Sequence, residues 1–95
     1  MAHYEIEISE LANDELEELR PFDRRPIVQA LRLLSHQAET ETRNRKRLRR
    51  PVEGLPRDTW QIRIGVHRVL YEVRAHATVR VLRVIIKTGT TGESL

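Results

Sequence analysis

The chain contains no cysteine, few aromatic residues and no long hydrophobic run. The absence of cysteine excludes a disulfide framework, a thiolate metal site and a cysteine nucleophile. Aromatic residues make up 4% of the 95 positions, so aliphatic side chains must fill most of the core. No apolar stretch approaches the roughly 20 residues of a transmembrane helix. The opening residues lack the charged-then-apolar order of a signal peptide, so we expect a cytoplasmic protein with no membrane partner.

Charge is divided unevenly along the chain, although the net charge is only +3. Residues 1–42 carry four Lys or Arg and ten Asp or Glu, which gives a net charge of −6. Residues 43–95 carry thirteen Lys or Arg and four Asp or Glu, which gives +9. A basic half of this kind attracts phosphates or an acidic partner.

The stretch from Trp60 to Lys87 predicts three strands. Apolar and polar residues alternate, as is typical of half-buried strands, over Trp60–Ile64, Arg68–Arg74 and Thr78–Lys87. The breaks are too short for a parallel crossover, so the strands form an antiparallel meander. One face then carries the core residues Trp60, Ile62, Val69, Tyr71 and Val73. The opposite face carries Gln61, Arg63, Arg68 and Arg74.

The first part of the chain predicts a further strand and two helices. Tyr4–Ile8 alternates strictly and is expected to pair with one of the last strands in the antiparallel sheet. Ser9 is the candidate N-cap of a first helix that ends before Pro21. Asp23 is the candidate cap of a second helix, which places Pro26 in the first turn and runs to about Ala38.

These elements predict one α+β domain spanning residues 1–95. The N-terminal strand joins a small antiparallel sheet, and the helical hairpin packs on one face of that sheet.

A basic run follows the second predicted helix. Six of the eight residues from Arg43 to Arg50 are Lys or Arg, and the residues up to Trp60 are expected to form a loop. A solvated charged loop is one interpretation. The other is contact with nucleic-acid phosphates through release of counterions. Under that interpretation the phosphate-binding residues are Arg43, Arg45, Lys46, Arg47, Arg49 and Arg50.

The polar sheet face holds a sharper candidate site. Arg63 and Arg68 lie on neighbouring predicted strands, where two permanently charged forks would cup one phosphate and stabilise a phosphorane-like transition state. Lys87 reaches the same area, and Gln61 lies on the same face. His67 is next to Arg68 and near its face, so it is a candidate for proton transfer in phosphodiester cleavage, with a solvated turn histidine as the alternative. No residue spacing indicates a metal site or a cofactor.

These residues resemble the RelE/ParE family of bacterial toxins. The motif W-x-[IL]-R-x-G-x-x-R-[VL]-x-Y-x-V carries the resemblance between Trp60 and Val73, and the similar order of elements extends from Tyr4 to Lys87. The resemblance implies the toxin of a type II toxin–antitoxin pair, with a microbial RNase-type fold. It also implies a cognate antitoxin as partner, with operator DNA reached only through that antitoxin. The antitoxin is expected to wrap the toxin and neutralise its basic surface.

The resemblance also assigns roles to residues. Arg68 falls on a catalytic arginine of the family, Arg63 and Gln61 fall on positions that RelE-type enzymes fill with lysines, and Lys87 lies near a second catalytic arginine. RelE-type enzymes often end with a tyrosine that stacks on the substrate base, whereas no aromatic residue follows Tyr71 here.

Three functions stay open. RelE-type members cleave mRNA in the ribosomal A site, and a ribosome-dependent endoribonuclease is the function that we expect. ParE-type members poison DNA gyrase, and the third alternative is a degenerate member that mainly binds an antitoxin and DNA.

Overall fold

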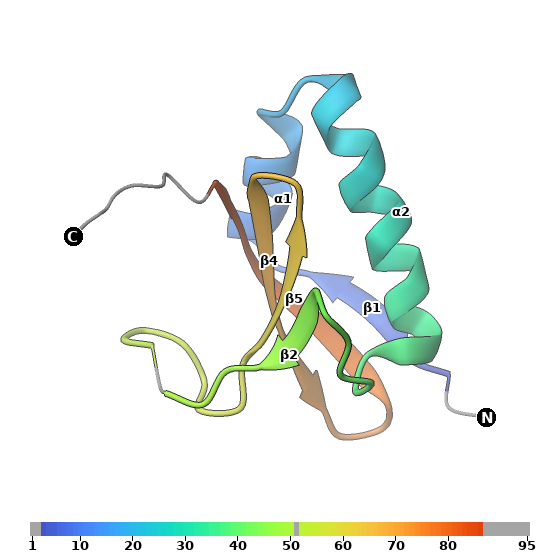
Figure 1. Ribbon diagram of the computed structural model, residues 1–95, viewed down its shortest axis with the longest axis vertical. Helices are drawn as coiled ribbons and strands as arrows, with labels where there is room; N and C mark the ends of the chain where they lie inside the picture. The colour runs from blue at the N-terminus through green and yellow to red at the C-terminus, as the bar shows by residue number, and fades with distance from the viewer. Residues whose placement is uncertain (1–2, 51, 87–95) are drawn as a thin grey trace.

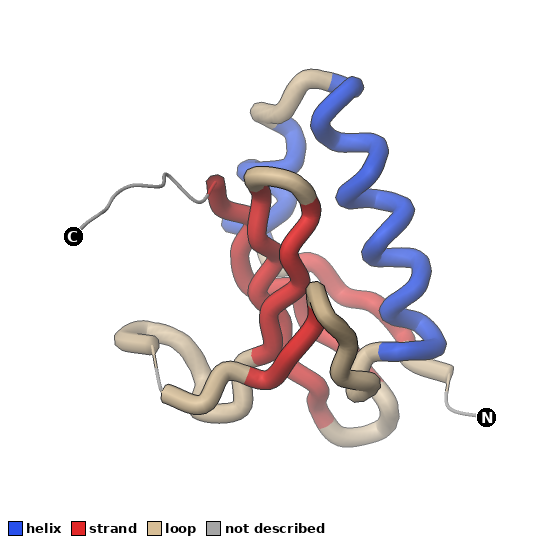
Figure 2. Tube along the Cα trace, viewed as in Figure 1, coloured by secondary structure: helices blue, strands red, loops and turns tan. Residues whose placement is uncertain are grey.

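The computed structural model of the protein describes residues 3–50 and 52–86. Its elements are β1 (Glu5–Ile8), α1 (Glu10–Glu17), α2 (Pro21–Gln37), β2 (Arg45–Arg47), β3 (Trp60–Ile64), β4 (His67–Arg74) and β5 (Thr78–Ile86). The five strands form one sheet in the order β1-β5-β4-β3-β2, with the helices packed against it (Figures 1 and 2). The predicted α+β class with a helical pair on a small sheet is confirmed.

The sheet is antiparallel from β2 to β5 and parallel at its β1 edge. β3, β4 and β5 form the predicted meander. β1 pairs with β5, as expected for one of the last strands, but the two strands run parallel, so the fully antiparallel arrangement was wrong at this edge. A parallel pair needs a long crossover, and the chain between β1 and β5 supplies it.

β2 forms a strand where the sequence predicts only a loop. Arg45–Arg47 pairs antiparallel with β3, and Arg45 lies opposite Ile62. Thr42 and Arg45 exchange both backbone hydrogen bonds, which closes a tight turn just before the strand. The predicted loop is therefore wrong over these three residues. Edge strands tolerate charged residues, and a strand made of them shows no apolar alternation.

Both predicted helices are present, and α2 begins earlier than expected. Ser9 is confirmed as the N-cap of α1, and its Oγ accepts the Ala12 N–H at 3.0 Å. α2 begins at Pro21, a position that suits the fixed φ of proline. Asp23 is therefore in the first turn and not at the cap, and Pro26 lies inside the helix. Among the described residues, no helix is long and apolar enough to cross a bilayer.

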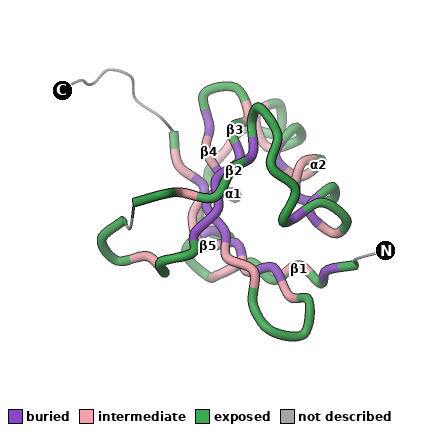
Figure 3. The backbone as a smooth tube through the Cα atoms, turned by 60° about the horizontal axis from the view of Figure 1, so that its bottom comes forward, coloured by how far each residue is buried: buried purple, intermediate pink, exposed green. Residues whose placement is uncertain are grey.

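The strand register places the core residues where the alternation predicts them. Trp60 lies opposite Tyr71 and Ile62 opposite Val69, and all four are buried. The helices supply the other wall of this core with Ala12, Leu16, Ile27, Leu31 and Leu34. Figure 3 shows buried residues concentrated in the central strands. Each fully buried aliphatic side chain contributes about 1.5–3 kcal/mol.

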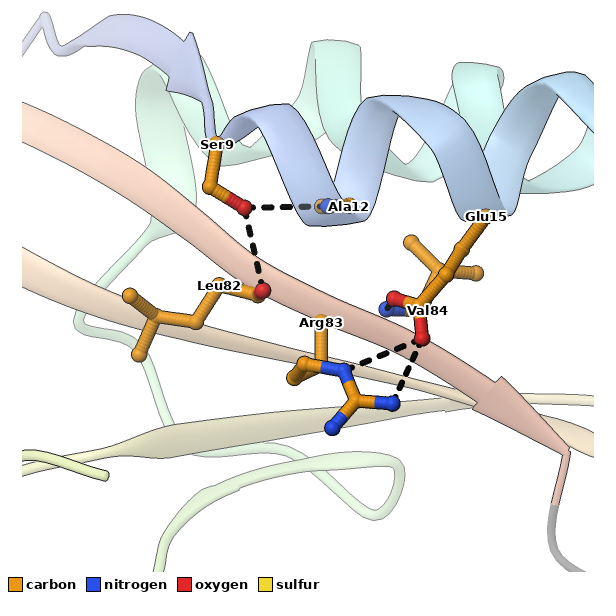
Figure 4. Close-up of polar contacts among 6 residues, drawn as sticks. All are labelled: Ser9, Ala12, Glu15, Leu82, Arg83 and Val84. Carbon is orange, nitrogen blue, oxygen red and sulfur yellow. Dashed lines mark hydrogen bonds and ion pairs between the residues drawn. The ribbon is translucent and has the colours of Figure 1, made fainter. Parts of the chain in front are cut away.

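α1 covers the edge of β5 beyond the end of β1 (Figure 4). The Ser9 hydroxyl donates to the Leu82 carbonyl at 3.0 Å, and Glu15 Oε1 accepts the Val84 N–H at 2.7 Å. Glu15 Oε2 also accepts two hydrogen bonds from Arg83, at 3.0 and 2.6 Å. An unpaired strand edge exposes backbone polar groups. The side chains of Ser9 and Glu15 satisfy two of these groups on β5.

Candidate functional site

The face of the sheet opposite the helices, called the outer face below, carries the three central residues of the predicted site. Arg63 on β3 lies directly opposite Arg68 on β4, and Gln61 lies on the same face opposite Leu70. Arg63 is exposed, Arg68 is half-buried and Gln61 is buried. The predicted register, with Arg63 and Val69 on different faces, is confirmed. Lys87 lies outside the described residues.

The Arg68 guanidinium is held by the side chain of Gln61. Nη1 of Arg68 donates to Oε1 of Gln61 at 3.1 Å, and Gln61 is only 8% exposed. Nε of Arg68 is buried and has no hydrogen-bond partner among the described residues. Arg68 is thus oriented by one contact and retains donors for a ligand.

Two arginines of β5 on the outer face form ion pairs with carboxylates. Arg80 lies 3.5 Å from Glu7 and Arg83 lies 2.6 Å from Glu15. The hydrogen bond that Arg83 donates to Glu15 raises the pKa of the Arg83 guanidinium above its ordinary value.

Arg63 and Arg68 have no such partners. Within residues 3–50 and 52–86, no carboxylate forms an ion pair with either arginine. Like charges directly opposite each other destabilise a sheet. An anion placed between the two guanidinium groups would remove that repulsion, so this corner of the outer face is suited to bind phosphate.

His67 lies on the other face of the sheet. It is the first residue of β4, lies opposite Ile64 and is 7% exposed. Its side chain lines a cleft of about 330 Å³ between the β3–β4 turn and the start of α2, where Phe22 and Pro26 form part of the wall. The expectation that His67 lies near the face of Arg68 is therefore wrong, because successive residues of a strand point to opposite faces.

The basic run is divided between the two faces of β2. Arg45 is 7% exposed, lies opposite Ile62 and donates from Nη1 to the Thr40 carbonyl at 3.2 Å. Unlike the other basic residues of the run, Arg45 is therefore buried, because the short strand turns this side chain inward. Lys46 lies opposite Gln61 and so faces the same side as Arg68. The exposed members of the run are Arg43, Lys46, Arg47, Arg49 and Arg50.

An irregularity in the pairing of β4 with β5 places Arg83 on the face opposite to the one that strict alternation predicts. The β4–β5 ladder is irregular between Leu70 and Tyr71, where Tyr71 lies opposite Val81 and Leu70 opposite Arg83. Leu82 is therefore the extra residue, and Arg83 lies on the outer face. No glycine or proline marks this bulge in the sequence.

Comparison with known proteins decides the family. A family profile described as "ParE toxin of type II toxin-antitoxin system, parDE" matches residues 6–87. The chain belongs to the RelE/ParE family of type II toxins. The resemblance noted from the Trp60–Val73 motif is thereby confirmed.

Solved structures agree with this RelE/ParE assignment. A chain of the RelBE2 toxin–antitoxin complex from Mycobacterium tuberculosis is 30% identical, with a TM-score of 0.72 over 90% of this chain and 99% of that one. The archaeal RelE–RelB complex from Pyrococcus horikoshii OT3 gives 18% identity and a TM-score of 0.75, over 93% of this chain and 99% of that one. The YoeB dimer from Staphylococcus aureus gives 16% identity and a TM-score of 0.63, over 86% of this chain and 94% of that one. The last two show the fold alone. Comparison with curated proteins finds no match.

Proposed function

We propose that this toxin is a ribosome-dependent mRNA endoribonuclease that arrests translation. The observation that carries the proposal is the Arg63–Arg68 pair, in which two cations lie directly opposite each other on the outer face. Neither forms an ion pair within the described part of the chain. A phosphodiester supplies the missing negative charge and accepts hydrogen bonds from both planar forks.

The arrangement suits attack by the RNA's own 2′-hydroxyl. The 2′-oxygen bonds to phosphorus, the bond from phosphorus to the 5′-oxygen breaks, and the hydroxyl proton passes through solvent to the departing oxygen. The products are a 2′,3′-cyclic phosphate and a 5′-hydroxyl end. Arg68 and Arg63 stabilise the charge that develops on the phosphorane oxygens, and removing one such donor costs about a hundredfold or more in rate.

The exposed basic residues extend this site toward the edge of the sheet. Lys46 lies beside Gln61 on the outer face, and the run from Arg43 to Arg50 continues along the same edge of the molecule. Phosphate contacts of this kind position a nucleic acid without reading its sequence. mRNA bound in the ribosome offers such a backbone.

A cognate antitoxin is the second partner that we propose. RelBE2 of M. tuberculosis and RelE–RelB of P. horikoshii are toxin–antitoxin complexes. A partner that buries Arg43–Arg50 must bring carboxylates, because burying unpaired charges costs several kcal/mol, as an order of magnitude. Operator DNA is then contacted through the antitoxin. Co-expression with the adjacent reading frame tests this, and a neighbour that neither binds the toxin nor relieves growth arrest would contradict it.

The nuclease proposal is tested by mRNA cleavage on translating ribosomes. Arg68→Ala is expected to lower cleavage about a hundredfold or more. Arg68→Lys should restore it only in part, because an ammonium group lacks the planar fork. Arg32→Ala is the matched control, since Arg32 is exposed on α2. If the wild-type protein cuts no mRNA on ribosomes, the proposal fails.

The family description favours inhibition of DNA gyrase as a second candidate function, because it names ParE. Gyrase supercoiling in the presence of the wild-type toxin tests it. Inhibition of supercoiling without cleavage of mRNA would replace the nuclease proposal with this one.

A further inference from the structure

The contact between Gln61 and Arg68 joins a neutral acceptor to a cation. Gln61 Oε1 accepts from Nη1 of Arg68 at 3.1 Å, and the two residues are diagonal neighbours on β3 and β4. Gln61 itself lies between Lys46 of β2 and Leu70 of β4. Its side chain is therefore confined on both sides within the sheet, and it is 8% exposed.

A carboxamide and a carboxylate would act differently at this position. Both offer an oxygen to the guanidinium, but a carboxylate also neutralises the charge and competes with any anionic ligand. The other well-held arginine of the outer face shows that outcome, since Arg83 donates twice to Glu15. Gln61 fixes Arg68 and leaves its full positive charge available.

Arg68 is also held at a cost to stability. Its Nε–H is buried without an acceptor among the described residues, and a buried unpaired donor lowers the stability of a fold. Features of this kind concentrate at functional sites. Nε of Arg45 is also buried without an acceptor among the described residues, so what distinguishes Arg68 is its place on the outer face beside Gln61.

We infer that Gln61 is a positioning residue, whose carboxamide oxygen orients the Arg68 guanidinium toward an RNA phosphate without neutralising it. The inference rests on the proposed function in taking RNA as the ligand. It replaces the expectation that Gln61 contacts phosphate directly, and it gives Arg68 the role of the contacting group.

A double-mutant cycle on RNA affinity tests the inference. The probe is a single-stranded oligoribonucleotide with 2′-O-methyl groups, which cannot be cleaved, and the readout is its dissociation constant at fixed salt. Gln61→Leu is expected to weaken binding about tenfold, within the range of couplings found inside one hydrogen-bond network. In the Arg68→Ala background, Gln61→Leu should have no further effect. Equal losses in both backgrounds would overturn the inference, because Gln61 would then act independently of Arg68.

Gln61→Glu separates orientation from charge. This variant keeps an acceptor for Nη1 and adds a negative charge, so we expect it to bind the same RNA at least as weakly as Gln61→Leu. Wild-type affinity in Gln61→Glu would overturn the argument from neutrality. Gln37→Leu is the matched control, since Gln37 is exposed on α2. Thermal unfolding checks that each variant is folded, and Gln61→Met substitutes for Gln61→Leu if the latter is not.

The two proposals fail in different ways. If the cycle shows coupling but wild-type protein cleaves no mRNA on ribosomes, the nuclease proposal fails and the positioning role stands. If wild-type protein cleaves mRNA while the two substitutions weaken binding additively, the positioning role fails and the nuclease proposal stands.

Discussion

Two buried side chains of the sheet bind the backbone that follows α2. The hydroxyl of Tyr71 donates to the Ala38 carbonyl, and Arg45 donates to the Thr40 carbonyl. The carbonyl of Ala38, the C-cap of α2, has no partner within the helix, and that of Thr40 lies in the loop beyond it, so these contacts satisfy groups that would otherwise need water. Arg45 therefore contributes to folding, whereas its exposed neighbours in the basic run remain available for a ligand.

Tyr71 gives the protein a specific response to alkaline pH. Burial raises the pKa of its hydroxyl well above the ordinary value, although the nearby charge of Arg45 acts in the opposite direction. Tyr71 is thus neutral in the folded state when the same tyrosine of the unfolded chain begins to ionise, near pH 10. The unfolding free energy contributed by this group is complete below that pH and falls as the pH rises toward the folded-state pKa.

Tyr71→Phe tests this response by denaturant unfolding at neutral and alkaline pH. At neutral pH the variant should lose about 1–2 kcal/mol, because the Ala38 carbonyl loses its buried donor. Between neutral pH and about pH 11 its unfolding free energy should fall less than that of the wild type. Tyr4, whose pKa is raised chiefly by its hydrogen bond to Glu39, is present in both proteins and does not affect the difference. Identical pH profiles would show that Tyr71 does not control the effect.

Among the elements, α1 acts as an extension of the sheet. Beyond the end of β1, the side chains of Ser9 and Glu15 form hydrogen bonds with backbone polar groups on the free edge of β5. Glu15 makes the larger number of contacts. Its carboxylate accepts three hydrogen bonds, two from Arg83 and one from the Val84 N–H.

Glu15→Ala is expected to lower the unfolding free energy by about 1–3 kcal/mol, because it leaves the Val84 N–H and Arg83 without their acceptor. Amide hydrogen exchange at Val84 should become faster than in the wild type, since its donor no longer has a partner. Glu18→Ala removes the same charge from an exposed position next to α1 and serves as the control. Unchanged exchange at Val84 would contradict the proposed role of α1.

The elements also show what could be predicted from the sequence. Alternation located β1, β3, β4 and β5, because each buries one face against the helices. It missed β2, whose charged residues give no apolar period, and it could not place Arg83, whose orientation depends on an unmarked bulge. His67 was misplaced because β4 begins one residue earlier than predicted.

Part of the candidate site could also be predicted from the sequence. Alternation places Arg63 and Arg68 on the same face of neighbouring strands, and the short β3–β4 turn makes them directly opposite neighbours. The hydrogen bond from Arg68 to Gln61 and the inward turn of Arg45 depend on side-chain conformation and on β2, neither of which leaves a signal in the sequence.

At the scale of the whole molecule, the sheet order converts the charge division of the sequence into a division in space. The acidic N-terminal part contributes β1 and α1, and β2 carries part of the basic run. β1 and β2 are the two opposite edges of the sheet. An anionic polymer is therefore attracted to one edge of the protein and repelled from the other.

The salt dependence of RNA binding tests this arrangement. The logarithm of the binding constant for single-stranded RNA should fall with the logarithm of salt concentration, and each lost phosphate contact should lower the slope by about 0.7. Arg43→Ala and Lys46→Ala are each expected to show that change, whereas Arg32→Ala on α2 should leave the slope unaltered. An equal change in all three variants would mean that only net charge matters.

The position of β5 also determines when the protein can fold. β5 pairs with both β1 and β4. Glu5 is the partner of Thr78 in the sheet, although most of the chain separates the two residues in sequence. During synthesis, β1 has no neighbour in the sheet until the ribosome has translated the codons for β5. Pairings so distant along the chain form slowly. Under the proposed function, a nascent toxin therefore cannot attack the message from which it is being made until those codons have been read.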